Sequence, residues 1–473
     1  MGVTNFAAFV NVIQPDAVVP VKKSTRATDN AFVRAGQNEQ AVVMDGMTHV
    51  YTLTASLGWK NKGPKKTDVD PSPKELEMYK VTGADVLQAF YRRIADYFNA
   101  YHLCATSPDT SQRPPPVLVM LLDKFKYVNP GKAACQKKRS AGKQEGYGPT
   151  VQYFMEGVRP TPTAIMQSID INKALSARGD GRRALFRFLL AGLVAKPQQF
   201  KWPPNSQLYV DTEEGIRLFM GTEAGELYEV HDFSDEEKRP VVDCKRAANQ
   251  LGESDLAAVR WTALLNRPVR LITTDTDWAM LHVYHIWPRV NKVPGVVWDN
   301  NGPIRSFCIA QAITTLRDDY HFTREAIVSL CVLSGCDYFE KSAATHMIGH
   351  PILYDGMFAL MKACAPRTGK PRPNLHTLDG MREALWHIYA TRLQCPPSGQ
   401  ALRLVKRSPG MPLLLDPDSL AEVFVAYKLA MDYFCQFLCW DPRADPQKPG
   451  GARLSALDRV QTMQTAFKRV HTK

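Results

Sequence analysis

Ala41-Val-Val-Met-Asp45 is a run of four apolar residues that ends in an acid, and it decides the fold class. The same pattern returns at Pro116-Val-Leu-Val-Met-Leu-Leu-Asp123 and at Val269-Arg-Leu-Ile-Thr-Thr-Asp275. Near-continuous apolar runs of this length are typical of buried parallel strands. Helical patterns over residues 83–100 and 254–265 lie between them. Strands that alternate with helices predict an α/β fold with a parallel sheet flanked by helices.

Composition and net charge limit the classes of protein to which the chain can belong. The chain has 473 residues, of which 45% are hydrophobic and 22% charged, about three domains' worth of ordinary globular sequence. Lys plus Arg number 59 and Asp plus Glu 47, a net charge of +12 that favours a polyanionic partner such as nucleic acid. The ten scattered cysteines fit free thiols. No apolar run suits a membrane helix and no signal peptide is evident, so we expect an intracellular protein that does not bind a membrane.

Acidic residues stand at the predicted strand ends and helix starts. They are Asp45, Asp123, Glu253, Asp255, Asp275, Asp277 and Asp337. The carboxyl ends of parallel strands open onto one crevice, where these acids would converge. Asp275 and Asp277 are two apart, so they would face the same side of an extended strand end. For any one acid alone, the alternative is a cap or turn residue.

So many carboxylates in one crevice would raise each other's pKa unless cations offset their charge. Mg²⁺ or Mn²⁺ prefers carboxylate and water oxygens. Two such ions about 3.5–4 Å apart can activate a water molecule and stabilise the leaving oxygen of a phosphodiester. The acidic series therefore predicts phosphodiester hydrolysis with two Mg²⁺ ions, for which Mn²⁺ can substitute.

Several further blocks carry a family resemblance. The chain opens Met1-Gly-Val-Thr-Asn-Phe6, and Tyr51 stands six residues after Asp45. Leu251-Gly-Glu-Ser-Asp-Leu-Ala257 and Ser334-Gly-Cys-Asp-Tyr338 are the most specific blocks. In this order, they resemble the flap endonuclease/XPG class of structure-specific 5′ nucleases, which is built on a PIN-like α/β domain. A divergent, viral member is our expectation.

The resemblance implies roles for particular residues. The seven acids would hold the two ions, directly or through water, and Tyr51 would stack on a base near the scissile bond. Lys132 and Arg139 would be catalytic residues of a gateway helix that clamp the scissile phosphate. The expected nucleic-acid contacts are Gly2, Tyr51, Lys132, Lys137, Lys138 and Arg139. Lys137 or Lys138 could take the clamping role instead, and a solvated basic helix face is the alternative for all of them.

The blocks also suggest a division of the chain. Residues 1–124 would form an N-terminal nuclease region, 125–245 a helical arch or cap insertion, 246–345 an internal nuclease region and 346–473 a mainly helical C-terminal region. A basic helix is predicted over residues 173–195 of the insertion. The family's Gly-rich helix-two-turn-helix would fall in a stretch with only two glycines, so its duplex grip and K⁺ site are not predicted. No sliding-clamp peptide is evident.

The function expected from these observations is Mg²⁺-dependent, structure-specific cleavage of branched or 5′-flap DNA during replication, repair or recombination. It would take place in the nucleus or at an intracellular site of viral DNA replication. Two alternatives stay open. One is an RNA endonuclease of the herpesvirus host-shutoff type, and the other is a non-catalytic DNA-binding scaffold on the same fold.

Overall fold

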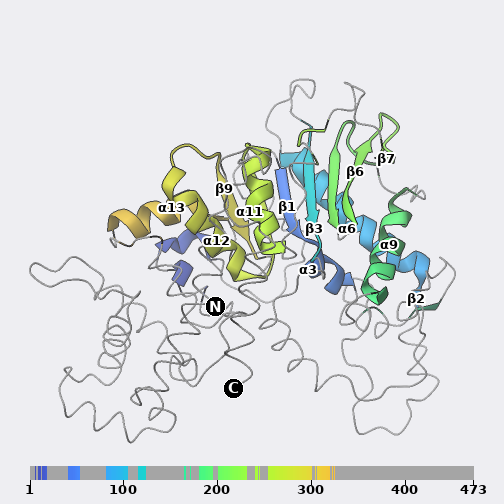
Figure 1. Ribbon diagram of the computed structural model, residues 1–473, viewed down its shortest axis with the longest axis horizontal. Coiled ribbons are helices and arrows are strands. Elements are labelled where there is room, and N and C mark those ends of the chain that lie inside the picture. Colours follow the sequence, from blue (N-terminus) through green and yellow to red (C-terminus); the bar gives the residue numbers. More distant parts are fainter. Residues whose placement is uncertain are drawn as a thin grey trace, which may run out of the picture. The chain divides into compact units, whose positions relative to one another are not determined.

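Figure 1 shows the computed structural model of the 473-residue chain. Asp337 and the predicted C-terminal region, 346–473, lie outside the residues that the structure describes. The described residues are 6, 9–11, 13–18, 41–53, 81–104, 115–123, 165–166, 171, 180–194, 201–212, 214–231, 240–242, 244, 254–300, 304, 306–319, 322 and 324.

The chain folds into two units, each assembled from separate stretches of sequence. The first unit is made of Met1–Thr25, Tyr127–Gln136 and Asp255–Lys473. The second unit is made of Arg26–Lys126 and Lys137–Ser254. Both contain parallel strands and helices, so the predicted α/β class is confirmed at this level.

Three parallel strands form the centre of the second unit. They are β1 (Ala41–Asp45), β3 (Val117–Leu121) and β5 (Gln207–Thr212). In register, Asp45 lies beside Leu121, and Leu121 lies beside Asp211. Strand β3 is buried along its whole length, which its apolar residues explain. The shared register puts the carboxyl ends of all three strands at one edge.

Two antiparallel strands extend this sheet beyond β5. Strand β6 (Gly215–Gly221) pairs with β5, and β7 (Leu227–Val230) pairs with β6. They lie in the stretch for which a helical cap was predicted, so this part of the insertion is sheet. Its Leu, Tyr, Val and Phe residues are good strand formers, and Gly215 supplies the positive φ of 125° at the tight β5–β6 turn.

Three helices complete the second unit. They are α3 (Gly46–Tyr51), α6 (Gly83–Cys104) and α9 (Asp180–Val194), and a short pair, β2 (Val81–Thr82) with β4 (Ile165–Met166), accompanies them. Helix α6 is four residues longer than predicted, and α9 begins seven residues later than predicted. The hydroxyl of Tyr91 on α6 donates to the carbonyl of Leu189 on α9 at 3.4 Å, which fixes α9 against α6.

The first unit is also built on strands. Strand β8 (Val269–Ile272) runs parallel to β9 (Val296–Asp299), and β9 pairs antiparallel with β10 (Phe307–Cys308). Helix α13 packs against α12 and β9. The described helices of this unit are α11 (Ser254–Leu265, whose first residue belongs to the second unit), α12 (Thr276–Ile286) and α13 (Ile309–Thr314). A π-helical turn follows α13 at Thr315–Asp319. Shorter 3₁₀ turns lie at Pro15–Ala17 and Trp287–Arg289.

The start of the chain is part of the first unit's core. The buried ring of Phe6 meets Trp298 edge-on at 5.3 Å and Phe307 at 5.8 Å between ring centroids. The side-chain amide of Gln14 donates to the carbonyl of Cys308 at 2.6 Å and accepts its N–H at 3.0 Å. Phe6 and Gln14 are therefore tied to β9 and β10, which lie almost 300 positions away in sequence. In the described residues, no helix is both long enough and apolar enough to span a membrane.

Candidate active site

Asp45 ends β1 and caps the helix that follows. Its Oδ1 accepts the backbone N–H groups of Met47 at 2.9 Å and Thr48 at 3.2 Å. Its Oδ2 accepts the Thr48 hydroxyl at 2.7 Å. Since a strand-end Asp can satisfy the unpaired N–H groups of a helix start, the local sequence accounts for this geometry. The carboxylate is half-buried and held in one orientation.

Asp123 lies two residues beyond the end of β3, the strand that pairs with β1, and Asp45 is the last residue of β1. Its Oδ1 accepts the backbone N–H of Ser254 at 3.2 Å, a contact between residues 131 positions apart. Ser254 is part of the block Leu251–Ala257. The structure therefore brings the end of the second acid-ended run next to the backbone of Ser254.

Tyr51 is the last residue of α3, and its side chain is 46% exposed. Among the described residues it is the one large hydrophobic side chain that is exposed. Partial burial raises the pKa of its phenol, and the carboxylates of Asp123 and Asp45 raise it further, whereas the Arg182 guanidinium opposes them. Both acids and one arginine thus act on the same phenol.

His49 stands between Asp45 and Tyr51 on α3 but faces the interior. Its ring lies 5.1 Å from that of Phe90 on α6. Burial, and after it the positive charge of Arg93, lowers the pKa of His49 to about 3. The imidazole is therefore neutral near pH 7 and gives the site no positive charge.

Asp211 is an acid that the sequence reading missed. It belongs to β5, is fully buried and lies in register with Leu121 of β3. Its carbonyl accepts the N–H of Leu122 at 3.0 Å, just before Asp123. The signal was present in Gln207-Leu-Tyr-Val-Asp211, another short apolar run that ends in an acid.

Asp275 of the first unit repeats the arrangement of Asp45. It follows β8 and caps α12, where its Oδ1 accepts the N–H of Asp277 at 2.9 Å. The pair was expected in an extended strand end, but α12 begins at Thr276. The capping bond is the physical reason, because it favours a helix directly after Asp275. Asp277 therefore lies in the first helical turn and is buried.

Two further acids of the first unit have buried partners. Oδ1 of Asp255 accepts the indole N–H of Trp278 at 3.1 Å, which ties α11 to α12. Asp299, at the end of β9, forms an ion pair with Arg270 of β8 at 3.2 Å, and both side chains are almost fully buried. Asp299 was not among the predicted site residues, and its role here is structural.

The structure thus describes five of the predicted acids and Tyr51. Asp45, Tyr51 and Asp123 lie in the second unit, and Asp255, Asp275 and Asp277 lie in the first. Within the described part of the chain, no group of three His, Cys, Asp or Glu side chains is close enough to hold a metal ion. The predicted residues outside the described part are Gly2, Lys132, Lys137, Lys138, Arg139, Glu253 and Asp337.

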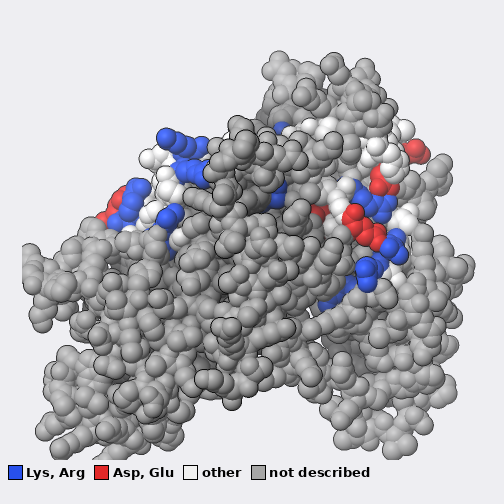
Figure 2. All heavy atoms as spheres, in the orientation of Figure 1, with Lys and Arg blue, Asp and Glu red and all other residues white. Residues whose placement is uncertain are grey.

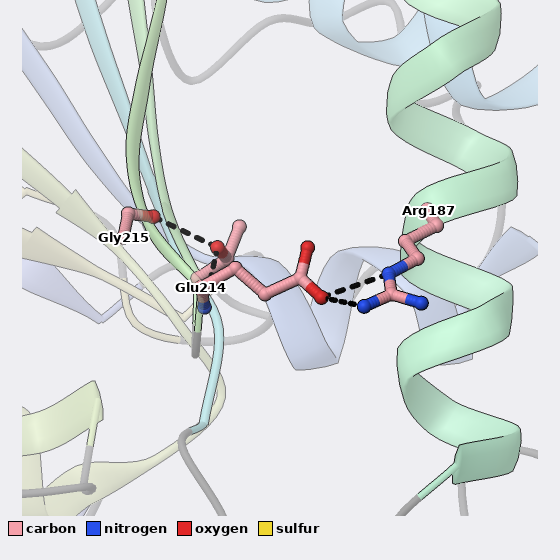
Figure 3. A network of polar contacts seen from close by, with 4 residues as sticks. Arg187, Glu214 and Gly215 are labelled. Carbon is pink, nitrogen blue, oxygen red and sulfur yellow. Dashed lines mark hydrogen bonds and ion pairs between the residues drawn. The ribbon is translucent and has the colours of Figure 1, made fainter.

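Charged side chains alternate in sign on the described surface. Figure 2 shows acidic atoms directly beside basic ones on the face in view. Two such pairs are known in detail. Arg187 of α9 bonds the carboxylate of Glu214 (Figure 3), and Arg217 of β6 bonds Glu229 of β7 through two contacts of 2.6 and 2.5 Å. The excess positive charge of the sequence is not carried by these pairs.

Comparison with known proteins adds no assignment. No protein-family model matches the sequence, and no curated protein sequence matches it. The argument for function therefore depends on the residues and contacts described above.

Proposed function

We propose that the chain is a divalent-metal-dependent nuclease on a PIN-like fold, which hydrolyses phosphodiester bonds near 5′ ends or junctions of branched DNA. The observation that supports this most is the bond from the Ser254 N–H to Asp123. It joins two motif blocks that are remote in sequence, at the edge of the sheet where Asp45 also lies.

The donor chemistry fits a hard divalent cation. Asp45 and Asp123 are half-buried, so their carboxylates are not sealed from solvent. A carboxylate has about four lone-pair positions, so Asp123, which accepts the N–H of Ser254, keeps capacity for a cation. When bound, Mg²⁺ would lower the pKa of a water molecule and offset charge on the leaving oxygen. In the proposal, the residues that would hold two such ions are Asp45 and Asp123 in the second unit and Asp255, Asp275 and Asp277 in the first, together with Glu253 and Asp337.

The chain's own groups would orient the substrate. The capping bonds fix the Asp45 carboxylate, so no rotamer search is needed when substrate binds. The exposed ring of Tyr51 offers a face on which a base can stack. In the proposal, Lys132 and Arg139 contact the scissile phosphate and offset its growing charge.

Substitution of the helix-cap acids tests the proposal. Asp275→Asn with Asp277→Asn, and separately Asp45→Asn, should reduce Mg²⁺-dependent cleavage of a 5′-flap duplex on the order of a hundredfold or more. Asn is as good an N-cap as Asp at positions 45 and 275, and at position 277, in the first turn of α12, it keeps the size of the side chain, so these proteins should stay folded. Asp85→Asn is the matched control, because Asp85 is an exposed acid that bonds Thr82 at the start of α6. Wild-type cleavage of the 5′-flap duplex by the Asp275/Asp277 variant would contradict the proposal.

A substrate panel separates the related functions. One preparation would be assayed on flap, nicked, gapped and bubble DNA and on capped mRNA at equal concentrations. Preferential cleavage of the flap supports the proposal. Preferential cleavage of mRNA supports the RNA endonuclease, and tight binding without turnover at saturating Mn²⁺ supports the scaffold.

A further inference from the structure

Buried hydrogen bonds between side chains join helices α11 and α12 of the first unit (Figure 1). In one of them, the indole N–H of Trp278 donates to Oδ1 of Asp255 at 3.1 Å. In another, Nε2 of His282 lies 3.1 Å from the hydroxyl of Thr262. Trp278 and His282 are one helical turn apart on α12, and Asp255 and Thr262 are two turns apart on α11, so each pair shares one face of its helix. The two bonds therefore link the same two helix faces.

The bond between Thr262 and His282 is neutral on both sides. Burial lowers the pKa of His282 to about 4, so its imidazole is uncharged near pH 7. Its Nδ1 lies 2.7 Å from the Trp278 carbonyl oxygen, which can only accept a hydrogen bond. Nδ1 therefore carries the proton, and Nε2 accepts the Thr262 hydroxyl. A neutral donor and a neutral acceptor are thus enough to join these two helix faces.

The bond between Trp278 and Asp255 differs because its acceptor is an acid. Asp255 is 5% exposed, and Trp278 is fully buried. A neutral amide oxygen would also accept the indole N–H, and no charge would then have to leave water. The start of α11 favours an acid in its first turn, but that effect is smaller than the cost of burying a charge. Helix packing therefore explains an acceptor at position 255, but it does not explain a carboxylate.

The position of Trp278 on α12 relates this bond to the other acids of the first unit. Trp278 directly follows Asp277, in the first turn of the helix that Asp275 caps. Its indole has a single N–H donor on a rigid ring system, so it holds one carboxylate oxygen in one place. The bond thus ties the acid of α11 to the turn of α12 that carries Asp277.

We propose that Trp278 is a positioning residue, which holds the Asp255 carboxylate in the orientation in which it binds a divalent cation. The inference rests on the proposed function, which assigns Asp255 to the ions, and it names the group that orients this ligand. Hydrogen-bond partners behind a metal ligand fix its orientation, and their loss commonly weakens metal affinity about 10- to 100-fold. Trp278 itself touches neither the ion nor the DNA in this role.

Trp298 supplies a matched control. It is also a fully buried tryptophan of the first unit, but its indole N–H bonds no other group in the described part of the chain. Trp298→Phe therefore removes the same ring atoms and the same N–H as Trp278→Phe without affecting an acid. Thr262→Val is a second control, because it breaks the neutral link between α11 and α12 and leaves the bond to Asp255 in place.

The test measures Mn²⁺ binding to the full chain by electron paramagnetic resonance, in which the signal of free Mn²⁺ falls as the ion binds. Trp278→Phe should weaken Mn²⁺ affinity about tenfold or more. It should also raise the Mg²⁺ concentration needed for half-maximal cleavage of a 5′-flap duplex, and the rate should recover when Mg²⁺ is in excess. Trp298→Phe and Thr262→Val should bind Mn²⁺ like the wild type, even where thermal unfolding shows that they are less stable.

Asp255→Asn tests the same role without changing the size of any side chain. The amide oxygen can still accept the indole N–H, so α11 and α12 stay joined while the charge is lost. Mn²⁺ affinity should fall at least as far as in Trp278→Phe. Wild-type Mn²⁺ affinity in folded Trp278→Phe or in Asp255→Asn overturns the inference, and so does an equal loss of affinity in Trp298→Phe.

The same measurements separate this inference from the proposed function. If Asp275→Asn with Asp277→Asn weakens Mn²⁺ binding and Trp278→Phe does not, the positioning role is wrong and the nuclease stands. If all variants bind Mn²⁺ as expected but the wild-type protein cuts no DNA, the nuclease is wrong and the positioning role stands.

Discussion

Asp45 in the second unit and Asp275 in the first have the same local structure. Each follows a buried parallel strand, and each caps the helix that starts one residue later. Asp45 accepts the N–H groups of Met47 and Thr48 and the Thr48 hydroxyl from its own helix, and Asp275 accepts the N–H of Asp277. Capping alone therefore explains why an acid stands at each place, and only a test that separates cap from charge can assign a further role.

The residue after each acid differs between the two units. After Asp45 comes Gly46, where an added Cβ would lie 2.6 Å from the Leu122 side chain and 2.8 Å from the Leu121 carbonyl oxygen. After Asp275 comes Thr276, a buried side chain that fits. The close approach of α3 to β3 thus leaves no room for a side chain at position 46, whereas the matching position in the first unit holds one.

The largest loss of stability should come from breaking the buried ion pair of Asp299, an acid other than Asp45 and Asp275. Asp299 ends β9 as a partner of Arg270, in a buried ion pair. Arg270→Met leaves Asp299 buried and uncompensated, and should lower the free energy of unfolding by about 3–5 kcal/mol. Urea unfolding measures this. Arg270→Met with Asp299→Leu should recover most of the loss, and a double variant no more stable than the single one would contradict the structural role.

Gly46→Ala should come next. Its Cβ meets a backbone oxygen that cannot move cheaply, so we expect a loss of about 1–3 kcal/mol in unfolding free energy. If the proposed nuclease is right, cleavage by the folded fraction should fall as well, because α3 carries both Asp45 and Tyr51. Thr276→Ala is the counterpart in the first unit, and it should be milder. Equal losses at the two positions would remove the difference between the units.

Much of this framework could be predicted from the sequence. The run Ala41–Asp45 became β1 with the predicted bounds, and residues 254–265 became α11 with the predicted bounds. Both predictions depend on the local pattern of apolar residues, which can be read directly from the sequence. Strands β5, β6 and β7 were not predicted, since their apolar residues stand in a stretch read as an insertion between motifs.

The sequence predicted the site residues that stand at strand ends, but not the contacts that form only when remote segments fold together. Asp45 and Asp123 were found because acids that end apolar runs are visible in the sequence. The bond from the Ser254 N–H to Asp123 was not, since it joins residues 131 positions apart in sequence. The helical position of Asp277 was also missed, because period-two spacing was weighed without the capping tendency of Asp275.

Acid should destabilise both units through histidines whose pKa burial lowers: His49 in the second unit, and His282 and His285 in the first. The pKa of His49 is lowered to about 3 and that of His282 to about 4, in both cases mainly by burial. In the unfolded state each histidine takes up a proton near pH 6.5, whereas in the folded state it stays neutral at that pH. The free energy of unfolding therefore falls as the pH drops. Between pH 7 and 5 each histidine should remove about 2 kcal/mol from the unfolding free energy.

Urea unfolding across this pH range gives the slope, and His49→Gln and His282→Gln should each flatten it. His282 bonds the Trp278 carbonyl at 2.7 Å, which favours its protonated form and raises its pKa relative to that of His49. Below about pH 4 the contribution of His282 therefore stops growing while that of His49 continues. Slopes that do not change in the Gln variants would show that other groups govern the acid response.

The smallest effect separates cap from charge at the two matched acids. Asp45→Ala and Asp275→Ala should each lower the unfolding free energy by about 1 kcal/mol, because the helix start loses its acceptor, whereas the Asn variants should lose almost nothing. Thermal unfolding with and without Mg²⁺ completes the test. If both acids only cap, Asn and wild-type proteins respond to Mg²⁺ alike. If they hold a cation, the Asn variants keep the stability of the metal-free protein but lose the stabilisation that Mg²⁺ confers, since an amide oxygen has no charge to offset that of the ion.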